Sequence, residues 1–88
     1  SPVKRIGHAR FLRNALIAIG NAGDASLLPL VVERLTHDSP LVRAMAVWAA
    51  SRLSDHDSFK ALARDRVSRE TDLDVRAEWA RGCGDMAP

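Results

Sequence analysis

The stretch from Ser39 to Leu53 constrains the fold more than any other, because it is apolar on nearly every side and contains no glycine. Ser39 followed by Pro40 is typical of a helix start, where serine can cap free backbone N–H groups and proline already has a helical φ angle. The alanine-rich run that follows favours helix throughout. A helix without a polar face must lie between other helices. We therefore expect residues 40–53 to form the middle of a helical stack.

The composition is that of one small helical domain without a membrane segment. The chain has 88 residues, of which 47% are hydrophobic, 27% are charged and only 5% are aromatic. Tyrosine is absent and β-branched residues are few, and both features disfavour a sheet. No apolar run approaches the roughly 20 residues that span a bilayer. We therefore expect an all-α domain that has no contact with a membrane.

The start of the chain and its cysteine content suggest where such a domain works. Ser1 and Pro2 are not followed by the charged and apolar regions of a signal peptide, and we expect a domain excised from a longer protein. Cys83 is the only cysteine, which excludes an internal disulfide and fits the reducing cytoplasm. It lies between two glycines near the C-terminus, where we expect it to be exposed. The expected location is cytoplasmic.

Hydrophobic spacing predicts four helices besides the central one. They cover residues 2–19, 27–35, 59–67 and 73–81, with turns at 20–24, 36–39, 54–57 and 68–72. The residues expected in the core are Phe11, Leu12, Ala15, Leu16 and Ile19, then Leu28, Val31 and Leu35, then Leu41, Val42, Met45, Ala46, Trp48, Ala49 and Leu53, then Phe59, Leu62, Ala63 and Val67, and finally Val75 and Trp79. The last helix is more charged than the central one, so the burial of Trp79 follows less clearly than that of the others.

An internal repeat organises these helices. The tripeptide V-R-A at 42–44 recurs 33 residues later at 75–77, and residues 13–20 align with residues 43–50. The units lie at approximately 3–36, 40–68 and 73–82, and a two-helix unit cannot bury its own apolar face, so units stack into a solenoid. We expect one domain, residues 1–88, that forms a short right-handed solenoid of about five helices with polar outer faces on its first and last helices.

These motifs resemble a known repeat family. The pattern R-x-x-A-x-x-A at 43–49, with G-D at 23–24 inside a unit and D-x-P-x-V-R at 38–43 between units, is similar to the HEAT-like repeats of phycobilisome lyases. The resemblance covers nearly the whole chain. It implies an α–α superhelix.

A narrower resemblance is to the C-terminal HEAT-like domain of bacterial epoxyqueuosine reductases. It rests on L-R-N-A-L-I-A-I-G-N-A-G-D at 12–24, L-P at 28–29, P-L-V-R at 40–43, A-V-W-A at 46–49 and Arg52, while Ala50 stands where glycine is usual. The resemblance implies a parent oxidoreductase that reduces epoxyqueuosine to queuosine at the wobble position of tRNA, with cobalamin and two 4Fe–4S clusters. It also implies that this segment docks the tRNA anticodon arm for an upstream catalytic domain of the same chain.

Charge is distributed unevenly, and the basic part lies in the first helix. Residues 1–23 carry four basic residues and no acidic one, whereas residues 55–88 carry eight acids and six bases. Arginine and lysine bind phosphate oxygens and release counterions from a nucleic-acid backbone, and asparagine can hydrogen-bond ribose or base edges. The candidate nucleic-acid-binding residues are Lys4, Arg5, Arg10, Arg13, Asn14, Asn21, Arg43 and Arg52. Trp48 can also stack on a base, although its apolar helix favours the core.

The same basic residues have a structural interpretation. A basic first helix is also typical of a solvated terminal face. Arg13, Arg43 and Arg76 recur at one position of the repeat, where an arginine can pair with an acid in an adjoining turn, such as Asp24 or Asp57. The sequence leaves open whether these three arginines stabilise the stack or bind a ligand.

No motif for catalysis or for a metal is present. His8, His37 and His56 are far apart and lack partners at metal-ligand spacing, and neither a phosphate loop nor a nucleophile elbow occurs. One cysteine cannot hold an iron–sulfur cluster. We expect no catalytic residue, metal or cofactor in this segment. Two alternatives to tRNA docking remain open, a protein–protein interaction scaffold and a subunit of a bilin lyase.

Overall fold

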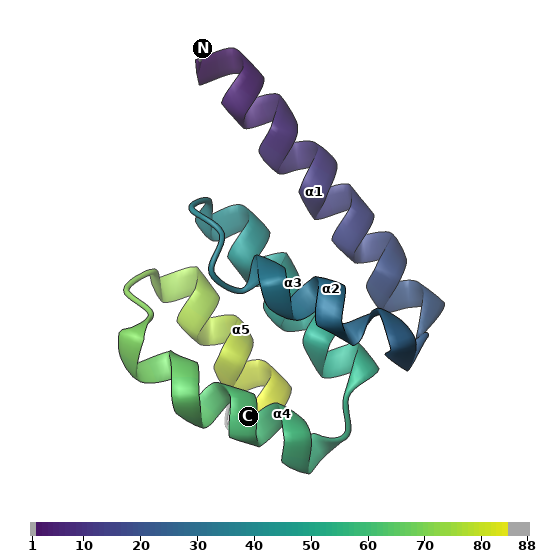
Figure 1. Cartoon of the computed structure of the whole chain (residues 1–88). Coiled ribbons are helices and arrows are strands. Elements are labelled where there is room, and N and C mark those ends of the chain that lie inside the picture. The colour runs from purple at the N-terminus through teal and green to yellow at the C-terminus, as the bar shows by residue number, and fades with distance from the viewer. Residues whose placement is uncertain (1, 85–88) are drawn as a thin grey trace.

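The part of the chain that the structure describes consists of helices joined by short connections (Figure 1). The structure, a computed structural model, describes the backbone of residues 2–84 and the side chains of residues 7–84. Its elements are α1 (Pro2–Ala22), η1 (Ala25–Leu27), α2 (Leu28–Arg34), α3 (Pro40–Leu53), α4 (His56–Arg66), η2 (Val67–Arg69) and α5 (Leu73–Cys83), where η denotes a short 3-10 helix. The expected all-α class is confirmed, with no strand in the described ranges.

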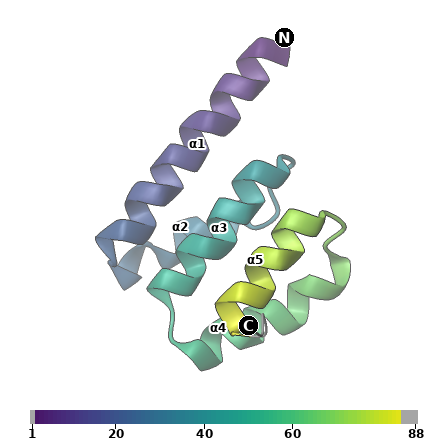
Figure 2. The same cartoon turned by 180° about the vertical axis from the view of Figure 1, so that it is seen from behind.

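The helices form two layers. Helices α1, α3 and α5 lie side by side in one layer, and α2 and α4 form a second layer on one face of it (Figures 1 and 2). Helix α3 packs against α1, α2 and α5, as expected of a helix that is apolar nearly all round. Side chains along α3 are fully buried, among them Val42, Ala46, Ala49 and Ala50. The first turns of α1 extend past the end of α3 (Figure 1).

The core lies between the layers and is continuous from α1 to α5. Its largest fully buried side chain is Phe59 of α4, whose ring centroid lies 5.2 Å from that of Trp79 of α5. Trp79 is only 2% exposed, whereas Trp48 is half-buried. The sequence predicted burial more clearly for Trp48 than for Trp79, and the structure shows the opposite order. Cys83 is buried, which contradicts the expected exposure, because α5 continues through it.

The buried stripe of α1 differs from the expected one. Phe11 is 68% exposed, whereas Ala9 and Leu16 are buried and Leu12 is partly buried. Ala9, Leu12 and Leu16 follow the three- and four-residue spacing of one helix face, and Phe11 is rotated about 100° from Leu12. The expected stripe therefore included one residue from the neighbouring face. Leu41, which was also expected in the core, lies in the first turn of α3 and is 41% exposed.

Several helix ends differ from the predicted ones because of local caps. Helix α1 passes through Gly20 and ends at Ala22, followed by Gly23 with a φ of +69°, a left-handed conformation that suits glycine. Helix α4 begins at His56, not at Phe59, because the Asp55 carboxylate accepts a hydrogen bond of 2.8 Å from the Ser58 N–H. The histidine predicted in a loop therefore lies in the first turn of a helix.

Gly20 is required by close packing between α1 and α3. A Cβ atom added at Gly20 would lie 2.9 Å from Cη2 of Trp48 and 3.0 Å from its Cε3. Both distances are shorter than an ordinary van der Waals contact between two carbon atoms. We expect Gly20→Ala to destabilise the fold by about 1–3 kcal/mol, because the indole must move out of its contact with the core. Urea unfolding measures this change.

Gly7 provides the matched control for this prediction. It lies in the same helix, and a Cβ added there meets nothing within 4 Å. We expect Gly7→Ala to stabilise the protein by about 0.5–1 kcal/mol, because alanine favours the helix over glycine wherever its Cβ atom has room. If both variants gained stability equally, the close approach of α1 to Trp48 would be refuted.

Candidate functional site

An ion pair joins the beginning of α3 to the connection between α4 and α5. Nε and Nη2 of Arg43 donate to the two carboxylate oxygens of Glu70 at 2.9 and 3.0 Å, and Nη1 donates to the backbone oxygens of His37 and Asp38 at 2.8 and 3.0 Å. The side chains are 17% and 9% exposed. An acid in an adjoining connection was expected as the partner of Arg43, and it is Glu70 instead of Asp24 or Asp57. Asp24 instead caps η1, and Asp57 lies in the first turn of α4, whose cap is Asp55.

Glu70 is held as a carboxylate by this arrangement. Burial pushes its pKa upward, but hydrogen bonds from Arg43 and from the Asp72 N–H, together with the charge of Arg43, outweigh burial and hold the pKa below its ordinary value of 4.5. The bond from the Asp72 N–H measures 3.0 Å. Glu70 therefore connects two repeat units and also fixes the turn before α5.

We expect acid to weaken the fold partly through Glu70. The pKa of this carboxyl is lower in the folded than in the unfolded chain, so its contribution to stability is complete above the unfolded pKa and is lost as the pH falls through the folded one. Urea unfolding between about pH 6 and about pH 3 should show a shallower loss of stability in Glu70→Gln than in the wild type. Equal slopes in that interval would contradict this role.

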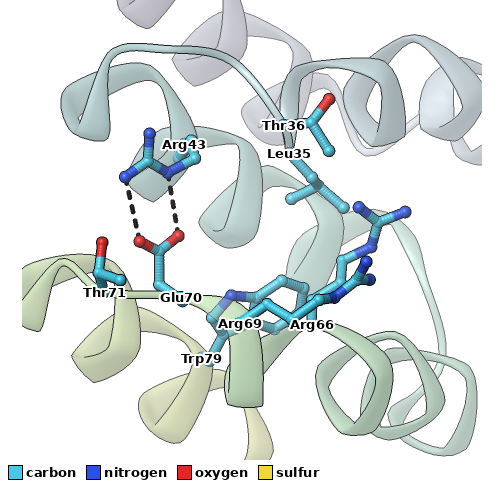
Figure 3. A pocket seen from close by; sticks show the side chains of 8 residues that line it. All are labelled: Leu35, Thr36, Arg43, Arg66, Arg69, Glu70, Thr71 and Trp79. Atoms are coloured by element: carbon cyan, nitrogen blue, oxygen red, sulfur yellow. Dashed lines mark hydrogen bonds and ion pairs between the residues drawn. The ribbon is translucent and has the colours of Figure 1, made fainter.

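A cavity of about 320 Å³ opens beside this ion pair (Figure 3). Its lining includes Trp79, Thr36 and, besides Arg43, the guanidinium groups of Arg66 and Arg69. Arg69 forms an exposed ion pair with Asp65 at 2.9 Å, and Nε of Arg66 is buried without a hydrogen-bond partner among the described residues. The cavity therefore carries more positive than negative charge.

Neither Arg66 nor Arg69 was among the residues predicted from the sequence. Summing charge over residues 55–88 hides them, because acids elsewhere in that range outnumber the bases. A signal was present nonetheless, since R-D-R-x-x-R at 64–69 places two arginines three positions apart at a helix end. The connection between α4 and α5 brings them to the Arg43–Glu70 pair.

The second group of candidate residues lies along α1. Arg10, Asn14 and Asn21 are exposed, and Nε and Nη2 of Arg13 donate to Oδ1 of Asn14 at 3.3 and 3.2 Å. Exposed Phe11 follows Arg10 in the sequence. The side chains of Lys4 and Arg5 lie outside the described residues. Within the described side chains, α1 thus presents cations, amides and an aromatic ring to solvent.

Arg52 lies at the far end of α3 from Arg43. Its guanidinium carbon is 6.0 Å from the ring centroid of Trp48, at the limit of a cation–π contact, and the ring packs against Gly20 of α1. Nine positions separate the two arginines, which corresponds to about 13 Å along the helix. Among the predicted residues whose side chains are described, Arg43 is paired with Glu70, and the others lie along α1 and at the end of α3.

Neither a metal site nor a membrane span is found in the described ranges. No three His, Cys, Asp or Glu side chains between residues 7 and 84 are grouped so that they could hold a metal ion. Among the described helices, none combines the length and the apolar character needed to cross a bilayer.

Comparisons with known proteins identify the family to which this chain is similar. The family profile described as HEAT repeats matches residues 7–84. The chain is 42% identical over 53 residues to an epoxyqueuosine reductase of Xanthomonas campestris pv. campestris, covering 59% of this chain and 15% of that protein. It is 31% identical over 71 residues to an epoxyqueuosine reductase of Bacillus subtilis, covering 80% of this chain and 18% of that protein.

A third relative carries no functional name. It is a Geobacillus stearothermophilus protein called "Uncharacterized protein in gldA 3′ region", 32% identical over 71 residues, which cover 80% of this chain and 32% of that protein. The chain thus spans less than a third of the length of each of these curated relatives, and no solved structure matches it significantly. The stacked helix pairs and the profile match agree: the chain belongs to the HEAT-repeat family.

Proposed function

We propose that this chain is the tRNA-docking module of an epoxyqueuosine reductase and that it binds the anticodon arm through α1. Relatives named epoxyqueuosine reductase support the assignment to queuosine modification of tRNA. The observation that carries the docking role is the exposed face of α1, which presents Arg10, Asn14 and Asn21 in a segment, residues 1–23, that has four basic residues and no acid.

The chemistry of this face suits a folded RNA. Guanidinium groups bind phosphate oxygens, and each neutralised phosphate releases counterions, so binding weakens as salt is added. Unpaired bases of an RNA loop stack on aromatic side chains and hydrogen-bond to amides. Phe11, at 68% exposed, and the neighbouring Asn14 supply both groups next to Arg10. Arg43 takes no part in this proposal, because Glu70 occupies its guanidinium.

The reduction itself belongs to the parent enzyme in this proposal. Iron–sulfur clusters require several cysteine ligands, and this chain has only Cys83, so its residues do not fit such a cluster. Cobalamin and two 4Fe–4S clusters would be held by an upstream catalytic domain, which acts on the wobble nucleotide in the bacterial cytoplasm. The role of this chain is to position the anticodon arm. We assign it no catalytic residue.

A protein-binding scaffold is the second candidate. Four large apolar side chains are exposed in the described part of the chain, namely Phe11, Leu30, Leu41 and Leu73. Single exposed apolar residues are common on soluble proteins. The basic, acid-free α1 favours RNA over a protein partner.

The test is binding to an anticodon stem-loop of a queuosine-type tRNA at several salt concentrations. We expect the affinity to fall with salt, and we expect Arg10→Ala and Arg13→Ala each to lower the logarithmic salt slope by about one unit. Arg64→Ala is the control, because Arg64 is an exposed arginine on α4, in the other layer. Binding that is absent at all salt concentrations, or that depends equally on Arg64, would refute docking through α1.

A further inference from the structure

The charges around the cavity beside the Arg43–Glu70 pair are not balanced (Figure 3). Arg43, Arg66 and Arg69 supply three guanidinium groups to its wall, and Glu70 supplies the one carboxylate among the lining residues. Both oxygens of Glu70 are already occupied, by the Arg43 guanidinium and by the Asp72 N–H. The charges of Arg43 and Glu70 therefore cancel within the cavity wall, and those of the other two arginines remain.

Arg66 is the arginine of this group that lacks a counter-ion. It is the last residue of α4 and is partly buried, and its Nε atom is buried without a hydrogen-bond partner among the described residues. No described carboxylate lies within ion-pair distance of its guanidinium. A cation that is partly removed from water without a partner costs free energy, so such side chains are usually paired. The cavity therefore offers Arg66 to an anion that the described residues do not supply.

Arg69 can contribute to the same anion. It follows Arg66 by three positions, at the end of η2, and Figure 3 shows both side chains extending toward Leu35. The ion pair of Arg69 with Asp65 is exposed, at 68% and 67% of the two side chains. Because an exposed pair of this kind contributes little to stability, a ligand can compete with Asp65 for the guanidinium.

The cavity has the size and the wall of a site for a small ligand. Its volume of about 320 Å³ lies at the lower end of the range of ligand sites, about 300–1,000 Å³. Leu35 and Trp79, which are buried, form an apolar part of the wall. Electrostatic attraction is stronger beside such a wall than in open water, because the local dielectric constant is lower. Thr36 and Thr71 add hydroxyl groups, which can donate hydrogen bonds to an anion.

From the unpaired charge and the cavity together, we infer that this site binds a phosphate group through the terminal nitrogens of Arg66 and Arg69. Nε of Arg66 is covered by protein, so only the terminal nitrogens of that side chain can reach a ligand. A phosphate group has enough oxygens to accept from two planar guanidinium groups at once, whereas one arginine already occupies both oxygens of the Glu70 carboxylate. The chemistry of the site therefore favours phosphate over a carboxylate.

The phosphate group can be a free ion or part of an RNA backbone, and the chemistry that binds it is the same. The inference does not rest on the proposed docking through α1, because none of the residues that line the cavity belongs to that helix. Inorganic phosphate can therefore test the site without any RNA.

The test follows the arginine side-chain N–H signals of the 88-residue protein by NMR while inorganic phosphate is added at constant ionic strength. We expect the signals of Arg66 and Arg69 to shift and to saturate, and we expect no such shift when chloride replaces phosphate. Arg66→Gln should weaken the binding about tenfold, measured through the Arg69 signal, because a hydrogen bond between charged groups is lost. Arg66→Lys keeps the charge but not the planar fork, so it should restore only part of the affinity.

Arg64→Gln is the matched control. Arg64 is an exposed arginine of the same helix, two positions before Arg66, and it does not line the cavity. We expect this variant to bind phosphate as the wild type does. An unchanged backbone amide spectrum away from the cavity verifies that each variant is folded.

A second titration, with the anticodon stem-loop, identifies the source of the phosphate group. If the group belongs to RNA, the stem-loop shifts the Arg66 signal and inorganic phosphate competes with it. If the group is a free ion, inorganic phosphate shifts this signal and the stem-loop leaves it unchanged. A shift at Arg66 with no effect of Arg10→Ala on RNA binding would separate this site from docking through α1.

The inference is overturned if neither ligand produces a saturable shift of the Arg66 signal in the folded protein. It is also overturned if chloride produces the same shift as phosphate, which would mean that salt only screens the charges. Equal weakening by Arg64→Gln and Arg66→Gln would contradict it as well, since binding would then depend on the overall charge of α4 and not on the cavity.

Discussion

Replacing Phe59 by alanine is expected to destabilise the protein by about 3–5 kcal/mol, the usual cost of removing a fully buried aromatic ring. Phe59 is 1% exposed, and its ring centroid lies 5.2 Å from that of Trp79. A Cβ atom added at Gly82 would clash with the Phe59 ring, so α5 also packs closely against it. The ring therefore fills the space between α4 and α5, and little can collapse into the void it leaves. A domain of this size has a total stability of about 5–13 kcal/mol, so the variant should be close to unfolding at 37 °C.

Phe11→Ala is the matched comparison for this prediction. Both positions carry the same side chain, but Phe11 is 68% exposed on α1. We expect a change within about 0.5 kcal/mol, as for most surface substitutions. Urea unfolding of both variants, followed by far-UV circular dichroism, measures the difference. A large loss of stability in Phe11→Ala would mean that the ring is buried as first predicted from the sequence.

Replacing Arg43 by glutamine is expected to cost about 2–4 kcal/mol. The substitution leaves the Glu70 carboxylate, 9% exposed, without its counter-ion, and removes the guanidinium from the backbone oxygens of His37 and Asp38. Loss of one partner of a fully buried pair costs about 3–5 kcal/mol, and the remaining exposure of this pair reduces that figure. The expected result is a fall in the urea midpoint with an unchanged m-value.

Arg76→Gln in the 88-residue chain is the control for this prediction. Arg76 also donates to a backbone oxygen but has no carboxylate partner among the described residues. We therefore expect the variant to lose less than about 1 kcal/mol of its free energy of unfolding. Combining Arg43→Gln with Glu70→Gln should recover part of the loss, because the stranded carboxylate is then gone. Additive losses would show that Arg43 stabilises the fold through its backbone contacts alone.

The candidate site was only partly predictable. The basic character of α1 is visible in the sequence, because it depends on residue types within one helix. The cluster of Arg66 and Arg69 beside Arg43 was not predicted, since those residues are more than twenty positions apart and meet only where two connections pack together. The role of Arg43 itself was left open by the sequence, and its partner Glu70, 27 positions later, was not predicted.

The sequence alone determined that this protein is helical, that it is built from repeats and that α3 lies in the middle. These properties follow from short-range patterns: the spacing of apolar residues, the Ser-Pro start of α3 and a 33-residue recurrence. The tertiary structure decided which side of α1 is covered, which acid meets Arg43, and that Trp79 and Cys83 are buried. Those outcomes depend on how far each unit overlaps the next. Overlap is set by packing between residues distant in the chain, and no local pattern specifies it.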